Sequence, residues 1–338
     1  MDADLSADQK ALAVAAREFL TKECPPSAVR EAWESTTGRN PRLWKQLAEV
    51  GFLGLAVPER YGGMGLGDLE LALLLEEAGR VALAEPLLET GVACLTLAEA
   101  GTEEQRDRWL PALAAGESVA TVQLTEQVLV ADAHVADVLV LARSGELHAV
   151  PAGRFTVQPQ RAFDGARRLF TVEADLGEDT RMLGGRDSTD RLVDRAAVAA
   201  AAVLVGIAAH LVEVTVGYVK QRHQFGRPVG SFQAVKHKLA EAHLAVETAR
   251  PAVWAAGHLL ATRSEEASVA ASVAKTYAAH AEALANEHCL QCHGGIGFTW
   301  EYDLHLWLKR GKALEQAYGS PRWHRTRLAD ILFGRAER

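Results

Sequence analysis

The segment that decides the fold is RHQFGRPVGSFQAVKH, residues 222–237. It separates two long apolar stretches, and its Gly226 and Pro228 end the first predicted helix. Ser231 is placed to cap the next helix. Arg222 lies at this break, near the free backbone N–H groups of the next helix start, where an arginine can clamp a phosphate. An arginine here equally suits the dipole of a helix C-terminus, so the residues alone leave both interpretations open.

Long helical stretches surround this segment. Apolar residues recur at helical spacing over residues 188–222, 231–258, 265–291 and 303–318. Long helices with short connections predict an antiparallel four-helix bundle. The most apolar run, from Ala196 to Ala209, is about 14 residues long and too short to cross a bilayer. We therefore expect a buried core helix and no membrane association.

Before the predicted bundle, the sequence changes from helical spacing of apolar residues to short runs typical of strands. Up to residue 117 it is helical, because Ser6 and Gln9 have the spacing of a capping box and Asn40-Pro41 begins a further helix. Short β-branched runs separated by Gly and Pro breaks follow. The predicted fold is mainly α with a small β-domain. Its predicted domains are an N-terminal helical domain (1–117), a reduced middle β-domain (118–185) and a C-terminal four-helix bundle (186–338).

A second informative run is QCHGGIGFTWEY, residues 291–302, at the end of a predicted long helix. Gly294 and Gly295 stop the helix and permit positive φ, and they let a ligand approach the backbone closely. One glycine-rich turn is weak evidence of a site, because many such turns only terminate helices.

Together the two runs resemble the acyl-CoA dehydrogenase family. In that family an Arg-x-x-Phe-Gly pattern joins the first two bundle helices and a Gln-x-x-Gly-Gly-x-Gly pattern ends the third. The resemblance covers the whole chain, including VPERYGG at residues 57–63, and Thr125-Glu126 match the start of a flavin-contacting segment. It implies a helical domain, a small β-domain and a helix bundle. It also implies FAD, lying between domains and across a subunit boundary.

The resemblance assigns the cofactor contacts as well. Arg222 and Phe225 match family residues on the pyrophosphate and adenine side of FAD. Gln291, Gly294 and Gly295 match further contacts to the same cofactor. Because these residues reach the FAD of the neighbouring subunit in the family, the resemblance implies a shared site.

The family's carboxylate base is missing from its expected places. The base removes an α proton while hydride passes from the β carbon to flavin N5, so its position is decisive. Counted from the Gly-Gly pair, the usual glutamate position is Tyr318, whose phenol loses its proton only at about pH 10. The second family position is Ala196. Asp194 and Glu315 lie nearby but are displaced along their helices, and we assign no catalytic residue to this chain.

The β-domain is also shortened, because Gln127-Val128 follow Thr125-Glu126 where the family has Pro-Gly-Ala-Gly. With the base and part of the β-domain missing, the sequence resembles the short chain of the actinobacterial heteromeric acyl-CoA dehydrogenases of steroid side-chain degradation. The resemblance implies an α2β2 heterotetramer in which this chain completes the FAD site of a full-length paralogue. It further implies an acyl-CoA substrate with a steroid side chain and an electron-transferring flavoprotein as the acceptor.

Other functions remain as alternatives. The chain could be a catalytically silent structural subunit without FAD contacts, or a homo-oligomeric dehydrogenase whose base is displaced. Cys289-x-x-Cys292-His293 has the form of a c-type haem attachment pattern, and the same residues with His288 offer zinc ligands. We predict no metal, since no second ligand pair is apparent in the sequence.

Composition narrows the class of partner and the location. Acidic residues outnumber basic ones by 44 to 36, which gives a net charge of −8. A general nucleic-acid binder would carry a basic footprint, so no nucleic-acid partner is expected. Four scattered cysteines do not form a disulfide framework, and the N-terminus lacks the pattern of a secretory signal. A cytoplasmic location is therefore predicted.

Overall fold

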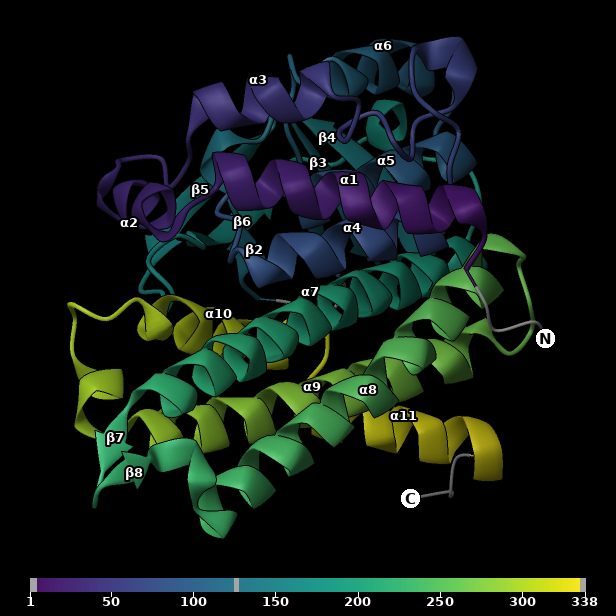
Figure 1. Cartoon of the computed structure of the whole chain (residues 1–338). Coiled ribbons are helices and arrows are strands. Elements are labelled where there is room, and N and C mark those ends of the chain that lie inside the picture. The colour runs from purple at the N-terminus through teal and green to yellow at the C-terminus, as the bar shows by residue number, and fades with distance from the viewer. Residues whose placement is uncertain (1–4, 125–127, 335–338) are drawn as a thin grey trace.

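The computed structural model describes residues 5–124 and 128–334, in which helices, then strands, then longer helices follow one another (Figure 1). The N-terminal helices are α1 (Ala7–Glu23), α2 (Pro26–Glu34), α3 (Pro41–Glu49), α4 (Asp68–Arg80), α5 (Leu87–Ala100) and α6 (Glu103–Ala114). The strands between the helical parts are β1 (Ala120–Gln123), β2 (Val130–Ala131), β3 (Val138–Arg143), β4 (Glu146–Pro151), β5 (Phe155–Gln160) and β6 (Leu169–Ala174). The later elements are α7 (Arg186–Gln221), β7 (His223–Gln224), β8 (Arg227–Pro228), α8 (Gln233–Ala261), α9 (Ala267–His293), α10 (Leu304–Gln316) and α11 (Pro321–Phe333).

The predicted helix bundle is confirmed. The four predicted helices correspond to α7–α10, and α11, which the sequence did not predict, packs against α9. Within the described part of the chain, α7 is the one helix long and apolar enough to span a membrane. However, 78% of its most apolar stretch is buried inside the protein. It is therefore a core helix, as predicted.

Side-chain caps explain where several helices begin. Ser6 and Gln9 exchange the two hydrogen bonds of the predicted capping box, at 2.9 and 3.2 Å. The Asn40 side chain accepts from the backbone N–H of Arg42 at 3.1 Å and so caps α3. The predicted cap at Ser231 is wrong. Ser231 lies inside a 3₁₀ turn, and this turn moves the start of α8 to the residue after Phe232.

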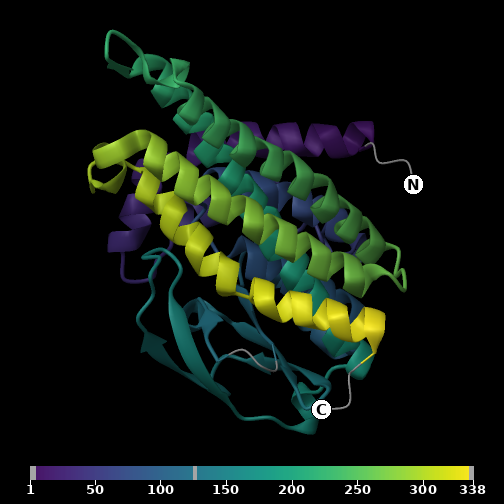
Figure 2. The same cartoon turned by 90° about the horizontal axis from the view of Figure 1, so that it is seen from below.

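Strands β1 to β6 form two small sheets on one side of the bundle helices (Figure 2), and β7 and β8 form a separate two-stranded hairpin. In the first sheet β1 runs parallel to β3, with Ala120 opposite Val138, and β3 and β4 form an antiparallel hairpin. In the second sheet β6 lies between β2 and β5 and is antiparallel to both. The division into three domains at residues 117 and 185 stays a prediction.

The N-terminal helices and the bundle share one hydrophobic core, and two glycines set the distance between them. A Cβ added at Gly79 of α4 would lie 2.2 Å from the carbonyl oxygen of Val203. A Cβ added at Gly206 of α7 would lie 1.9 Å from the carbonyl oxygen of Glu76. Because no side chain fits in either gap, α4 and α7 cross with their backbones almost in contact.

Candidate functional site

The two sequence motifs meet at one end of the bundle, beside the β7–β8 hairpin (Figure 1). Tyr218 in the last turn of α7 stacks on His293, the last residue of α9, with their ring centroids 4.5 Å apart. This contact joins the helix ends that carry the predicted cofactor residues. All five of these residues are exposed to solvent: Arg222, Phe225, Gln291, Gly294 and Gly295.

The geometry of this end suits a phosphate-containing cofactor. A Cβ added at Gly294 or Gly295 would meet no atom within 4 Å, so the backbone there is open to a ligand. Gly294 has a φ of +64°, which favours glycine. Arg222 forms no ion pair with any residue that the structure describes, so its guanidinium is available to a phosphate. The residues therefore fit FAD, and we call this set of five residues the flavin cradle.

The β7–β8 hairpin contributes the aromatic side chain of the cradle. Phe225 is 92% exposed and has a φ of 54° at the turn of the hairpin. Its ring lies edge-on to Phe232, with the centroids 6.2 Å apart, and the Arg227 guanidinium covers Phe232 at 4.1 Å. An exposed aromatic ring on a tight hairpin is a surface for a planar ligand or for a second chain.

Tyr318, which the sequence predicts at the position of the family base, belongs to a buried polar group. Tyr318 is 2% exposed, and its hydroxyl donates to the Glu89 carboxylate at 2.7 Å. Arg167 donates to the same carboxylate at 3.0 Å and to the Tyr318 hydroxyl at 3.1 Å. Burial and the adjacent Glu89 charge raise the pKa of Tyr318 well above its ordinary value. This phenol therefore stays protonated and cannot serve as a base near neutral pH.

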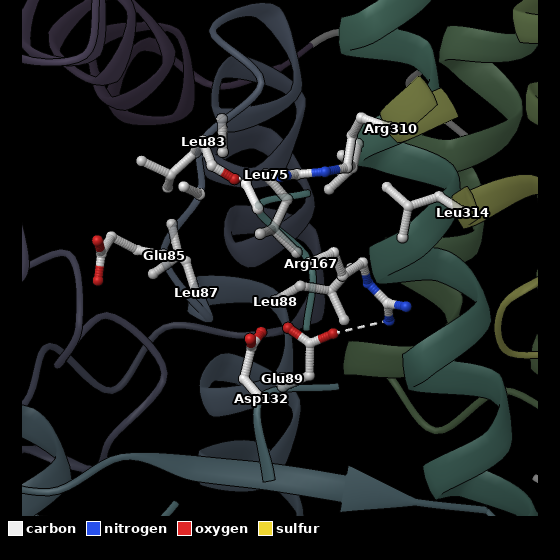
Figure 3. A pocket seen from close by; sticks show the side chains of 14 residues that line it. Leu75, Leu83, Glu85, Leu87, Leu88, Glu89, Asp132, Arg167, Arg310 and Leu314 are labelled. Carbon is white, nitrogen blue, oxygen red and sulfur yellow. Dashed lines mark hydrogen bonds and ion pairs between the residues drawn. The ribbon is translucent and has the colours of Figure 1, made fainter. Parts of the chain in front are cut away.

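A cavity of about 40 Å³ lies beside this group (Figure 3). Five charged side chains line it together with apolar ones: Glu85, Glu89, Asp132, Arg167 and Arg310. Glu89 and Asp132 lie together on one side, and Arg310 lies across from them. Sites for drug-sized ligands have roughly 300–1,000 Å³, so this cavity is too small for an acyl chain.

Charges around the cavity are paired except at Asp132. Arg310 pairs with Asp164 and donates to the Leu83 carbonyl oxygen at 2.5 Å. One carboxylate oxygen of Asp132 has no hydrogen-bond partner among the described residues. Burial, together with the charge of Glu89, raises the pKa of Asp132 to about 8. The cluster therefore favours a protonated Asp132 at neutral pH.

The loop that carries Tyr318 is held by a fully buried lysine. The Lys275 ammonium donates to the carbonyl oxygens of Glu315 and Gly319, at 2.9 and 3.0 Å. Burial lowers the pKa of Lys275 to about 7. These two bonds fix the end of α10 and the turn in which Tyr318 takes a φ of 55°.

The carboxylates considered as displaced bases are engaged elsewhere. Asp194 pairs with Arg327 at 2.5 Å and accepts from the Ser268 hydroxyl at 2.6 Å. Glu315 pairs with Lys312 at 3.0 Å. Ala196 is fully buried inside α7. None of these three positions lines the cavity beside Tyr318.

Glu89 and Arg167 were missed by the sequence reasoning. A signal for Glu89 existed, because it stands alone in the apolar run from Leu87 to Val92 of α5. A charged residue in such a run requires a buried partner. The partner itself, Arg167, lies 78 residues away, and no local pattern marks it. Thr125 and Glu126, which match the family's flavin-contacting segment, lie outside the described residues.

The cysteine-histidine pattern is not arranged for a metal. No group of three His, Cys, Asp or Glu side chains suited to a metal occurs within residues 5–124 and 128–334. Burial raises the pKa of the Cys289 thiol to about 12, which opposes the thiolate that zinc binds. His293 turns one ring nitrogen to the Cys289 carbonyl oxygen, at 2.8 Å.

Known proteins are similar to this chain in sequence and in fold. The family model described as the acyl-CoA dehydrogenase N-terminal domain matches residues 6–117, and that of the C-terminal domain matches residues 184–333. Acyl-CoA dehydrogenase IpdE2 of Mycolicibacterium smegmatis is 35% identical over 97% of this chain and 100% of its own length. IpdE2 of Mycobacterium tuberculosis is 37% identical over 90% of this chain and 91% of its own.

Two solved complexes have the same fold. A chain of the Tcur3481–Tcur3483 steroid ACAD matches with a TM-score of 0.90 and 30% identity, covering 96% of this chain and 98% of that chain. A chain of the ChsE4–ChsE5 complex from Mycobacterium tuberculosis also gives a TM-score of 0.90, at 24% identity, over 99% of this chain and 100% of that chain. The chain therefore belongs to the acyl-CoA dehydrogenase family, whose members use FAD.

Proposed function

We propose that this chain is the non-catalytic subunit of a heteromeric, FAD-dependent acyl-CoA dehydrogenase that introduces an α,β double bond into an acyl-CoA thioester. The observation that carries the proposal is Tyr318. At the position of the family base it is a buried phenol bound to Glu89 and Arg167. A full-length paralogue in the same assembly then supplies the carboxylate base.

The flavin cradle gives this subunit its own task. Arg222 binds the pyrophosphate of the partner's FAD, and the open backbone at Gly294 and Gly295 lets the cofactor approach closely. Phe225 and Gln291 contact its adenosine part. When bound, FAD accepts the hydride that leaves the β carbon of the substrate. The residues of this chain orient the cofactor and take no part in proton transfer.

Substrate, assembly and location follow from the relatives. The 30% identity to a chain of a steroid ACAD supports a steroid side-chain thioester as the substrate. Likeness to chains of two complexes supports an α2β2 heterotetramer with the paralogue. Electrons then pass to an electron-transferring flavoprotein. A cytoplasmic location is part of the proposal, and the burial of α7 inside the protein is consistent with it.

Two alternatives have less support. A homo-oligomer with a displaced base needs a free carboxylate, whereas Asp194 is paired with Arg327 and Glu315 with Lys312. A purely structural subunit would not need both an arginine without an ion pair to any described residue and an open glycine backbone at the same end of the bundle. The structural alternative predicts that the cradle can be altered without loss of flavin from the complex, whereas the homo-oligomer predicts one FAD per chain without a paralogue.

The experiment is to purify the complex of this chain with its full-length paralogue and to measure FAD per complex. Arg222→Ala should lower the flavin content, because loss of a charged phosphate contact weakens binding about tenfold or more. Arg325→Ala is the matched control, since Arg325 is an exposed arginine on α11, at the other end of the bundle (Figure 1). Unchanged flavin content in the Arg222→Ala complex would contradict the proposal.

A further inference from the structure

His293 occupies the junction of the three segments that form the flavin cradle. It is the last residue of α9, it directly precedes Gly294, and it is 4% exposed. Its ring stacks on Tyr218 of α7, with an angle of 19° between the planes. Tyr302, in the connection to α10, lies at a centroid distance of 5.1 Å from His293 and also contacts Tyr218, at 6.3 Å. One imidazole therefore joins α7, α9 and that connection.

Hydrogen bonds fix the protonation of this ring. The Nδ1 atom lies 2.8 Å from the Cys289 carbonyl oxygen, and because a carbonyl only accepts, Nδ1 must carry the hydrogen. Nε2 of the neutral ring then has a lone pair and accepts from the Tyr302 hydroxyl at 3.1 Å. Burial lowers the pKa of His293, which favours this neutral form. Each ring nitrogen has one partner.

The same contacts reach both halves of the cradle. The Tyr218 hydroxyl donates to the His293 carbonyl oxygen at 3.4 Å, directly before the Gly294-Gly295 turn. The Tyr218 carbonyl oxygen accepts from the Arg222 backbone N–H at 2.9 Å. Arg222 and the glycine turn are thus connected through two residues. Movement of the His293 ring would shift the glycine backbone relative to the arginine.

We propose that His293 is a positioning residue for the flavin: stacked on Tyr218 and hydrogen-bonded to Tyr302, it holds Arg222 and the Gly294-Gly295 backbone as one preformed surface. The inference rests on the proposed function, since it concerns how this chain binds the partner's FAD. A preformed surface binds more tightly because less ordering is required on binding. It also gives the Cys289-x-x-Cys292-His293 pattern a use without a metal, because both ring nitrogens are engaged within the protein.

Three variants of the heteromeric complex test this role. Tyr302→Phe removes one hydroxyl and keeps the ring. His293→Asn keeps a donor near Nδ1 but loses the acceptor at Nε2, whereas His293→Gln places an amide oxygen within reach of Tyr302. The apo complex is titrated with FAD, and the dissociation constant is read from flavin fluorescence. The thermal midpoint of the apo complex is recorded in parallel.

The expected result is about fivefold weaker FAD binding in Tyr302→Phe and His293→Asn, the size of one lost buried hydrogen bond. His293→Gln, which keeps an acceptor for Tyr302 but not the ring on Tyr218, should bind FAD more tightly than His293→Asn does. Unchanged FAD affinity in the first two variants would overturn the inference, and so would a lower thermal midpoint with unchanged affinity, because that pattern indicates a purely structural role. Arg222→Ala separates the two proposals. If it too leaves FAD binding unchanged, the proposed function fails; if it alone weakens binding, only the positioning role fails.

Discussion

The buried pair of Glu89 and Arg167 can be tested by a double-mutant cycle. Glu89→Leu leaves the Arg167 guanidinium buried without its carboxylate partner, and Arg167→Met leaves Glu89 beside Asp132 without the neutralising charge. Each single change should lower the free energy of unfolding by about 3–5 kcal/mol, the cost of an unpaired buried charge. The double variant replaces the pair by apolar side chains and should lose far less than the sum.

The assay is urea denaturation of the purified complex at one fixed protein concentration, because dissociation makes the midpoint depend on concentration. Arg154→Met is the control. It breaks exposed ion pairs with Asp175 and Asp179, which contribute little, so its free energy of unfolding should stay close to that of the wild type. Additive losses in the cycle would refute the reasoning, since they would mean that Glu89 and Arg167 do not stabilise each other.

Three further changes have defined outcomes. The pKa of Asp132 is about 8 in the folded protein against 3.8 ordinarily, so the native state holds a proton that the unfolded chain releases, and stability falls as the pH rises through this range. The stability of Asp132→Asn relative to the wild type should therefore increase from about pH 4 to about pH 8 and stay constant at higher pH. A difference in the free energy of unfolding by urea that does not change with pH would contradict this. Gly206→Ala should lower the free energy of unfolding by about 1–3 kcal/mol, because the added methyl group forces α4 and α7 apart. Gly217→Ala, in open space on the same helix, should be neutral or stabilising. Equal shifts of the thermal midpoint in the two variants would contradict the close crossing of α4 and α7. Tyr318→Glu should give no dehydrogenase activity in the chain alone, because a second carboxylate beside Glu89 is driven to its protonated form; measurable turnover would show that only the base was missing.

The helical framework was predictable because its signals are local. Ser6 and Gln9 mark the start of α1 by their spacing, and the long alanine-rich stretch around Ala196 marks α7 as a buried helix. Local signals also misled at Ser231, where a preceding 3₁₀ turn displaced the expected cap. Helices α2, α5 and α11 were missed, although Pro26 and Pro321 stand at the first position of two of them.

The buried polar group of Tyr318, Glu89 and Arg167 was not predictable, because its residues lie far apart in the chain. Glu89 and Tyr318 are 229 residues apart, and Arg167 lies 151 residues before Tyr318. Counting along the motif predicted Tyr318 at the position of the base. It could not show that an arginine and a carboxylate fill the space around the phenol. Likewise, the motifs predict the residues of the flavin cradle, whereas the stacking of Tyr218 on His293 depends on the packing of α7 against α9.

The most direct test of the central claim is the stoichiometry of flavin in the native complex with the full-length paralogue, measured by flavin absorbance together with native mass. One FAD for each pair of unlike chains in a tetramer is the predicted result, with no flavin retained by this chain alone. A homo-oligomer of this chain that carries one FAD per subunit and oxidises an acyl-CoA would contradict the account.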